Sequence, residues 1–418
     1  MTKLIDKQII VGLDIGTSKI SVVIGECINE NEINIIGFGS SPSAGVDKGG
    51  VNDLESVILS VQNAINKAEE MSECEISNVY LSLSGRHIVC QTEKGMVPIS
   101  DKEVTQKDVE NVIHTARSVK INNEYKTLHV IPQEFTIDFQ QGIKNPVGLS
   151  GVRMEATVHM INCHNDMAQN LVKAVQRCNL KVDDLIFSGL ASSHSSLTMD
   201  EKELGVCLID IGAGTMDLAI WTGGSLRYAA VIPYAGNNVT ADIAYAFGTP
   251  TNNAEELKVK FGCALSSEVN KDDKIDVPSV GGRPSRTLHS KTLAEVIEPR
   301  YIELFGMIRE KIDEIQINLN SSGTKHHLAA GVVLTGGASK IEGIADCAER
   351  IFQMQARVGV PVGVYGLNEK IEAPDYATAV GLLKYARDNR HYLKKNIAEP
   401  KKTYSILTKV TNWFRKEF

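Results

Sequence analysis

The apolar positions of this 418-residue chain follow the same pattern in two separate places. Each place holds three runs rich in β-branched residues, with turn-forming residues between or at the ends of them, which is typical of an antiparallel meander. The runs are residues 9–16, 19–27 and 33–41 in the first place, and 205–212, 215–224 and 225–234 in the second. The first run of each set ends in Asp-Ile-Gly. The chain is therefore predicted to contain a duplicated β-meander.

Helical periodicity follows each meander. Residues 51–72 and 164–180 repeat apolar positions at spacings of three and four, which predicts helices with one buried face. In the second half, a helix is predicted to begin at Pro299, because proline is favoured at the first helical position. Its apolar positions up to Leu319 form one stripe, which is predicted to pack into the core.

Two segments interrupt the repeat. Residues 84–162 contain their own strands and one helix, which predicts an inserted α+β subdomain, and residues 239–299 are predicted to form a smaller, mostly helical subdomain. The predicted fold class is α/β, with two duplicated halves around a cleft. The other predicted parts are a first-half core (1–83, 163–202 and about 362–388), a second-half core (203–238 and 300–361), a flexible linker (389–402) and a C-terminal amphipathic helix (403–418).

The composition is ordinary for a globular protein, with 43% hydrophobic and 23% charged residues. The chain has no run of apolar residues long enough to span a bilayer and no signal-peptide pattern, so export is not expected. Its eight cysteines form no C-x-x-C pair, which argues against a zinc or redox site. The net charge of −7 argues against general nucleic-acid binding.

The two Asp-Ile-Gly turns carry the first candidate chemistry. Glycine lets backbone N–H groups approach a phosphate, and an aspartate at the end of a strand can hold Mg²⁺ or its waters. A turn that needs glycine would explain one such loop, but two loops at the same point of two repeats predict one nucleotide bound between the halves. The candidates are Asp14, Gly16, Thr17, Ser18 and Lys19 in the first loop, and Asp210, Gly212, Gly214 and Thr215 in the second, with Asp14 and Asp210 near the metal.

A third segment, VVLTGGASKIEG (332–343), is predicted to be a buried strand, a glycine turn and the start of a helix. The close backbone approach that Gly336 and Gly337 allow suits packing against a ribose or adenine, and Ala338 and Ser339 follow them. Alone, this segment is an ordinary strand–helix turn. Together with the two upstream loops it predicts a nucleotide site.

Ordered DIGTSK, DIGAGT and VLTGGAS segments on a duplicated meander resemble the sugar kinase, Hsp70 and actin ATPase superfamily. Within it, the whole chain resembles the FtsA family of bacterial cell-division proteins, of the gammaproteobacterial kind. The resemblance runs through LIDIGAGTMDLAIW, NNVTADIAYAFGT, AEELKVKFG and LAEVIEPRYIEL to the closing NWFRKEF. It implies an actin-like fold around a nucleotide cleft, ATP and Mg²⁺ as cofactors, and a family-specific subdomain at 84–162.

The resemblance also implies further site residues. Gly236 and Asn237 match a third phosphate-facing turn, although many relatives carry Asp at the position of Asn237. Glu255 and Lys258 match a pair that reaches the ribose, and a solvated helix face would explain them equally well from the sequence alone. Ser188 stands where hydrolysing relatives carry Glu or Gln to orient water. Serine is too short and too weak a base for this, so at most weak ATP hydrolysis is expected.

The function implied by the resemblance is that of an ATP-binding, self-assembling adaptor at the division septum. It would anchor FtsZ filaments to the cytoplasmic face of the inner membrane and help recruit later division proteins, such as FtsN, through the inserted subdomain. The C-terminal peptide of FtsZ would contact Arg300 and Glu303, unless Arg300 makes only local salt bridges. A phosphotransferase of the sugar-kinase type is the alternative, but the sequence shows no obvious catalytic base for it. An Hsp70-like chaperone would need a further substrate-binding domain.

The last residues are predicted to bind an anionic membrane surface. Residues 390–402 are polar and interrupted by Pro400, which indicates a tether, and five basic residues against one acidic residue follow between 401 and 418. The apolar side chains there have helical spacing, and basic residues flank them. A stripe of this kind usually packs on a protein's own core, but this one follows a tether. The predicted membrane residues are Ile406, Leu407, Val410, Trp413, Phe414, Arg415, Lys416 and Phe418.

Overall fold

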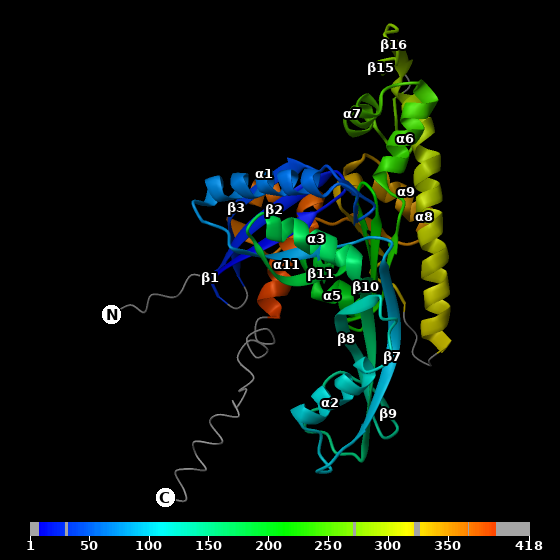
Figure 1. Cartoon of the computed structure of the whole chain (residues 1–418). Coiled ribbons are helices and arrows are strands. Elements are labelled where there is room, and N and C mark those ends of the chain that lie inside the picture. Colours follow the sequence, from blue (N-terminus) through cyan, green and yellow to red (C-terminus); the bar gives the residue numbers. More distant parts are fainter. Residues whose placement is uncertain (1–7, 30–31, 271–272, 322–326, 367, 390–418) are drawn as a thin grey trace, which may run out of the picture.

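The computed structural model describes residues 8–29, 32–270, 273–321, 327–366 and 368–389. Two large sheets form the centre of the molecule, with helices against them, and a smaller subdomain projects from each end (Figure 1). The predicted linker and membrane helix, residues 390–418, lie outside the described residues. Among the helices within the described ranges, none has the length and apolar character needed to cross a membrane.

The first sheet has the strand order β11-β6-β1-β2-β3-β19. Its antiparallel meander continues through β6 and β11, each of which runs parallel to its neighbour. The strands are β1 (Gln8–Ile15), β2 (Lys19–Cys27), β3 (Ile33–Pro42), β6 (Asn78–Leu83), β11 (Lys181–Phe187) and β19 (Tyr365–Gly366), and the short pair β4 (Val46–Asp47) and β5 (Gly50–Val51) lies outside this sheet.

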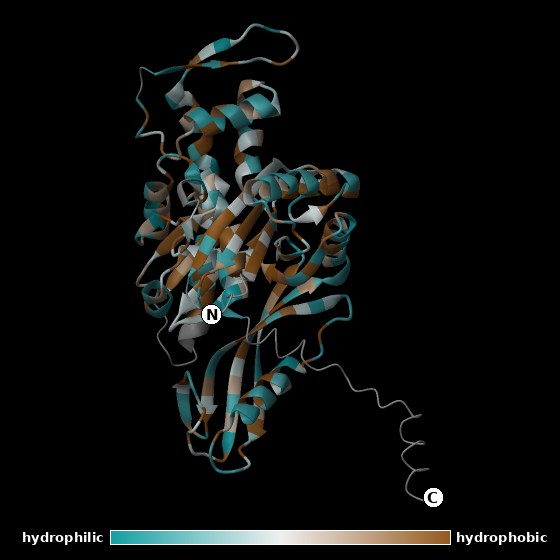
Figure 2. Ribbon diagram, turned by 90° about the vertical axis from the view of Figure 1, so that its left-hand side faces the viewer, coloured by the Kyte–Doolittle hydropathy of each residue, from teal (hydrophilic) through white to brown (hydrophobic). Residues whose placement is uncertain are grey.

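The second sheet repeats this arrangement, with the order β14-β13-β12-β17-β18. It too has an antiparallel meander followed by two parallel neighbours. The strands are β12 (Val206–Ile211), β13 (Met216–Thr222), β14 (Ser225–Ile232), β17 (Val332–Thr335) and β18 (Ala356–Val358). The shared order confirms the predicted duplication. Buried apolar side chains hold both meanders in place, and the central strands are mainly hydrophobic (Figure 2).

The first-half helices form where the sequence predicts an amphipathic face. α1 (Leu54–Ser72) begins after Asp53, whose carboxylate accepts hydrogen bonds from the backbone N–H groups of Glu55 and Ser56. Such an N-cap satisfies donors that have no partner within the helix. The other first-half helices are α3 (Asn165–Arg177), α4 (Ser188–Ser196), α5 (Met199–Leu204), α10 (Asn368–Ile371) and α11 (Ala377–Asp388).

In the second half, the prediction that a helix begins at Pro299 is wrong. α8 runs without a break from Ser290 to Ser321, with Pro299 inside it. Proline cannot donate a helical hydrogen bond, but side chains on both sides of it, including Ile297 and Tyr301, are buried in one core and hold the helix together. The other elements there are α6 (Gly236–Phe247), α7 (Thr251–Phe261), the hairpin β15 (Lys274–Val277) and β16 (Arg286–His289), and α9 (Ile344–Phe352).

Residues 84–162 contain a four-stranded sheet of order β7-β10-β8-β9 with α2 packed on it. This subdomain has its own apolar core and lies at the opposite end of the molecule from the β15–β16 hairpin (Figures 1 and 2). Its elements are β7 (Ile88–Pro98), α2 (Gln106–Arg117), β8 (Tyr125–Ile137), β9 (Gln140–Ile143) and β10 (Arg153–His164).

Candidate functional site

A cavity of about 380 Å³ opens where the glycine turns of the two halves converge. Every nucleotide-contacting residue predicted from the sequence lines it, except Asn237 and Ser339. The lining residues from that set are Asp14, Gly16, Thr17, Ser18, Lys19, Asp210, Gly212, Gly214, Thr215, Gly236, Glu255, Lys258, Gly336, Gly337 and Ala338. Turns far apart in the sequence therefore form one site.

The two Asp-Ile-Gly turns have the same backbone hydrogen bond. Gly16 N–H donates to the carbonyl of Lys19 at 3.0 Å, and Gly212 N–H donates to the carbonyl of Thr215 at 2.9 Å. The turns also touch across the cleft, because a Cβ atom added at Gly214 would lie 2.6 Å from Thr17 Oγ1. Glycine at 214 thus lets the halves approach closely at the cavity.

The third turn docks on the second. Gly236 N–H donates to the carbonyl of Gly212 at 3.2 Å, and Asn237 N–H donates to the carbonyl of Ala213 at 2.8 Å. The N–H group of Asn237 is therefore used within the protein, and its side chain is exposed outside the cavity. Asn237 does not line the cavity, and its contact with a nucleotide stays a prediction.

Gly336 is the turn residue with the tightest steric requirement. Its φ is +84°, and an added Cβ atom would lie 2.3 Å from Asp210 Oδ1. The Ser339 hydroxyl donates to the carbonyl of Gly336 at 2.7 Å inside the 3₁₀ turn η1 (Gly337–Lys340), which buries Ser339 away from the cavity. Ser339 therefore supports the turn and does not line the cavity, and its direct contact with a ligand stays a prediction.

Three aspartates face the cavity, Asp14 partly buried and Asp210 and Asp217 buried, and each is held by a hydroxyl group. Ser82 Oγ donates to Asp14 at 2.6 Å, Thr378 Oγ1 donates to Asp210 at 2.9 Å, and Ser84 Oγ donates to Asp217 at 2.6 Å; all three aspartates line the cavity. Oxygen groups of this kind suit a hard cation such as Mg²⁺ or its waters. Within the part of the chain that the structure describes, no three His, Cys, Asp or Glu side chains are grouped to hold a metal by themselves.

Burial raises the pKa of all three aspartates. For Asp14 it outweighs the Ser82 hydrogen bond and the Lys19 charge, which both lower the pKa. Burial and next the charge of Asp14 raise the pKa of Asp210 to about 6. Burial and next the charge of Asp210 raise the pKa of Asp217 well above its usual value. Such carboxyl groups gain most from a cation that neutralises them.

Asp217 is a site residue that the sequence reasoning missed. It lies on β13 directly opposite Asp210, with only 4% of its surface exposed. The available signal was an ionisable residue in a strand that is otherwise apolar apart from its terminal threonine, MDLAIWT, because a buried charge needs a partner or a function.

Ser188 lies where α4 begins and lines the cavity. The helix start is close to Asp217, since a Cβ atom added at Gly189 would lie 3.3 Å from the Cβ of Asp217. Ser188 and Asp217 therefore belong to the same end of the cavity. Of the two, only Asp217 carries a group that can accept a proton effectively.

The cations of the site are already paired within the chain. Lys19 Nζ lies 2.6 Å from Asp375 Oδ2 and 3.8 Å from the centre of the Tyr376 ring. Lys258 Nζ donates to the carbonyl of Gly236 at 3.1 Å and lies 2.7 Å from Glu255 Oε2. A ligand phosphate would therefore compete with internal partners for Lys19.

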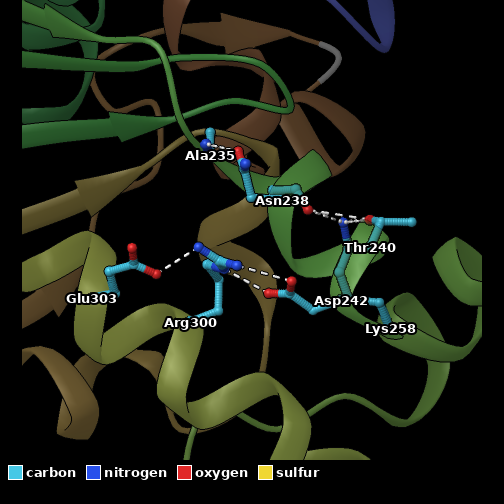
Figure 3. A network of polar contacts seen from close by, with 8 residues as sticks. Ala235, Asn238, Thr240, Asp242, Lys258, Arg300 and Glu303 are labelled. Atoms are coloured by element: carbon cyan, nitrogen blue, oxygen red, sulfur yellow. Dashed lines mark hydrogen bonds and ion pairs between the residues drawn. The ribbon is translucent and has the colours of Figure 1, made fainter. Parts of the chain in front are cut away.

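The predicted partner residues Arg300 and Glu303 lie on α8 (Figure 3). Neither residue lines the cavity. The Arg300 guanidinium makes two hydrogen bonds to Asp242 on α6, at 2.5 and 2.9 Å, and a third to Glu303. These are the local salt bridges that were the alternative to peptide binding. About a quarter of the Arg300 side chain, 27%, remains exposed.

The chain matches two family descriptions. "Cell division protein FtsA" matches residues 207–381, and "SHS2 domain inserted in FTSA" matches residues 85–162. Among solved structures, a PilM–PilN type IV pilus biogenesis complex has a TM-score of 0.66 at 17% identity, covering 91% of this chain and 98% of that one. MreB5 of Spiroplasma citri bound to ADP has a TM-score of 0.51 at 15% identity, covering 94% and 99%. These structures share the fold, which confirms the predicted actin-like architecture.

Sequence relatives extend over the full chain. The cell division protein FtsA of Escherichia coli K12 is 60% identical over 421 residues, covering 100% of both chains. That of Buchnera aphidicola from Acyrthosiphon pisum is 49% identical and covers 99% of both chains. That of Pseudomonas aeruginosa is 47% identical and covers 90% of this chain and 89% of its own. The chain belongs to the FtsA family of cell division proteins.

Proposed function

We propose that this member of the FtsA family is an ATP-binding, self-assembling adaptor that anchors FtsZ filaments to the cytoplasmic face of the inner membrane at the division septum. One observation carries the nucleotide part of the proposal: four glycine turns from two duplicated halves line a single cavity. Self-association and recruitment of later division proteins such as FtsN through the inserted subdomain belong to the same proposal and rest on the family.

ATP fits the cavity by its chemistry. Glycine turns bring backbone N–H groups to a phosphate, and the cavity volume of about 380 Å³ lies in the range of ligand pockets. Asp14 and Asp210 would hold Mg²⁺ or its waters, and the metal would neutralise phosphate charge. Gly336 and Gly337 would contact the nucleoside, with Glu255 and Lys258 toward the ribose.

ATP turnover should be slow, because Ser188 cannot orient and deprotonate water well. Asp217 is the better candidate for this role, since its carboxyl group lines the same end of the cavity and has a raised pKa. A steady-state rate below roughly 1 s⁻¹, the low end of typical enzymes, is expected.

For the FtsZ peptide, the surface between α6 and α8 around Arg300 is the proposed site. Tyr245 lies one helical turn from Asp242 on α6 and is 93% exposed, which offers an apolar contact beside the ion pairs. A peptide carboxylate would have to share Arg300 with Asp242, so Arg300 alone is expected to give modest affinity.

The test of this surface compares Arg300→Glu with Arg309→Glu, the same charge change farther along α8. Arg300→Glu should weaken binding of the FtsZ C-terminal peptide roughly tenfold and leave ATP affinity unchanged, since Arg300 lies outside the cavity. Arg309→Glu should change neither. Equal peptide affinity of all three proteins, measured by fluorescence anisotropy, would remove Arg300 from the interface.

The adaptor function is tested by flotation of anionic vesicles with purified FtsZ and ATP. The full chain should carry FtsZ filaments to the vesicles, whereas a chain without residues 404–418 should leave FtsZ in solution while still binding ATP. Trp413→Glu should act like the deletion, because losing one large apolar contact costs roughly 1.5–3 kcal/mol of membrane binding. Flotation of FtsZ by the truncated chain would contradict the proposed anchor.

A further inference from the structure

One short segment contacts three of the four glycine turns of the cavity, those at Gly16, Gly212 and Gly336. It comprises the 3₁₀ turn η2 (Pro374–Tyr376) and the first residues of α11. Lys19 of the first turn bonds the Asp375 carboxylate, and Thr378 donates to Asp210 of the second. The N–H group of Gly336, in the turn of Gly336 and Gly337, donates to the carbonyl of Pro374 at 3.1 Å.

Asp375 lies between two cations of the cavity wall. Its carboxylate oxygens are 2.6 Å from Lys19 Nζ and 3.4 Å from Lys340 Nζ, and all three residues line the cavity. Burial by itself would raise the pKa of Asp375, but the Lys19 and Lys340 ammonium groups hold it below its usual value. Asp375 is thus ionised and forms ion pairs with two lysines that line the cavity.

α11 connects this segment to the far side of the first half. The helix has 12 residues, about 18 Å of length, and near its other end Tyr385 OH lies 3.2 Å from His129 Nδ1 of the inserted subdomain. α11 also touches α4 backbone to backbone, since a Cβ atom at Gly381 would lie 1.9 Å from the carbonyl oxygen of Ala191. A contact without intervening side chains transmits a shift of one helix to the other.

We propose that Asp375 competes with the phosphates of a bound nucleotide for Lys19 and Lys340, and that this competition couples the cavity to α11. Phosphate oxygens that take over the two ammonium groups release η2, and α11 moves with it against α4 and the inserted subdomain. The proposal rests on the proposed nucleotide site and adds its regulation. Asp375 is a positioning residue, whose effect on the ligand runs through the two lysines.

The test uses the full chain with Trp413→Phe, which leaves Trp221 as the single tryptophan of the two in the sequence. Trp221 Nε1–H donates to Ser193 Oγ of α4 at 3.1 Å, so its emission reports on the packing of α4 against the second half. Titration with Mg-ATP should give a saturable change in emission. Asp375→Asn in this background should bind ATP about tenfold more tightly, the effect of about 1.4 kcal/mol, and should show a smaller emission change.

Asp346→Asn is the matched control, because it removes the same charge from an exposed position outside the cavity. It should behave like its parent. Equal or weaker ATP affinity of Asp375→Asn, or an emission change equal to that of the parent, would overturn the competition. If no variant binds ATP, the nucleotide site itself is wrong and this proposal falls with it. Asp375→Ser carries the same expectations, should Asp375→Asn fail to fold.

Discussion

The two halves of the molecule share a backbone plan and differ in the side chains they turn to the cavity. Asp14 on β1 pairs with Ser21 on β2, whereas Asp210 on β12 pairs with Asp217 on β13 at the same place in the repeat. The first half thus places a neutral hydroxyl where the second places a carboxyl. The first half also supplies Lys19 to the cavity.

This difference suits the two halves to different parts of a bound Mg-nucleotide. The second half concentrates buried carboxyl groups with raised pKa values, which suits a metal ion and an activated water. The turn of the first half has the same backbone hydrogen bond as that of the second, but it also carries the Lys19 cation, which suits a phosphate. The two halves share one backbone arrangement, and single positions such as 21 and 217 make their two sides of the cavity chemically different.

The largest expected effect comes from breaking the turn that packs on Asp210. Gly336→Ala forces a Cβ into a left-handed backbone position against Asp210, so we expect a loss of about 3 kcal/mol in unfolding free energy and no measurable ATP binding. Gly16→Ala in the first half, where φ is not left-handed, should cost less. Urea unfolding checks this, and equal losses for both variants would contradict the predicted asymmetry.

Removing the second-half carboxyl group should affect turnover more than binding. Asp217→Asn should lower the single-turnover rate of ATP hydrolysis roughly a hundredfold and change ATP affinity little, because a positioned base acts in the transition state. Its rate should also lose the rise with pH that titration of Asp217 gives the parent. Ser188→Ala is the matched control and should leave the rate nearly unchanged. A normal rate for Asp217→Asn would exclude this residue as the base.

The raised pKa of Asp210 predicts that stability and ATP affinity depend on pH, with a smaller effect than the two above. The folded protein raises its pKa from 3.8 to about 6, so its stabilising contribution is present below pH 3.8 and is lost as the pH rises through about 6. Asp210→Asn cannot ionise and should therefore gain stability relative to the parent as the pH rises across that range. Mg²⁺-dependent ATP affinity of the parent should fall as the pH drops below about 6. Urea unfolding and calorimetry at several pH values check both trends, and flat profiles would contradict the assignment.

The smallest effect is expected at the equivalent first-half position. Ser21 is fully buried, and its hydroxyl has no hydrogen-bond partner among the residues described. Ser21→Ala should therefore be neutral or stabilising by up to about 1 kcal/mol, with ATP affinity unchanged. Ser193→Ala, which removes a buried hydroxyl that bonds Gly189 and Trp221, should destabilise instead. Destabilisation by Ser21→Ala would show that its hydroxyl has a role in the first half.

Sequence reasoning reached the features that local patterns determine. Both meanders and the convergence of the glycine turns follow from alternation, turn residues and repetition, which are visible along the chain. The helix start at Pro299 was wrong because tertiary burial on both sides of the proline carries α8 through it. Local preference favours a helix start at Pro299, but burial in the shared core keeps the helix continuous through it.

Contacts between distant segments were beyond the sequence. The pairing of Lys19 with Asp375 spans 356 positions, and that of Arg300 with Asp242 spans 58. No local pattern shows which charged residues meet in the fold. Asp217 differs, since its place in an apolar strand was visible and its meaning became clear only beside Asp210. The membrane helix, outside the described residues, stays a prediction from its own periodicity.

The central proposal is that both halves bind one nucleotide, with the metal near Asp14 and Asp210. Calorimetric titration of Mg-ATP into the full chain, Asp14→Asn and Asp210→Ala tests it most directly, with circular dichroism to verify folding. We predict one ATP per chain and affinity losses of about tenfold or more in both variants, the larger in Asp210→Ala. Unchanged affinity in either folded variant would contradict a site shared by the two halves.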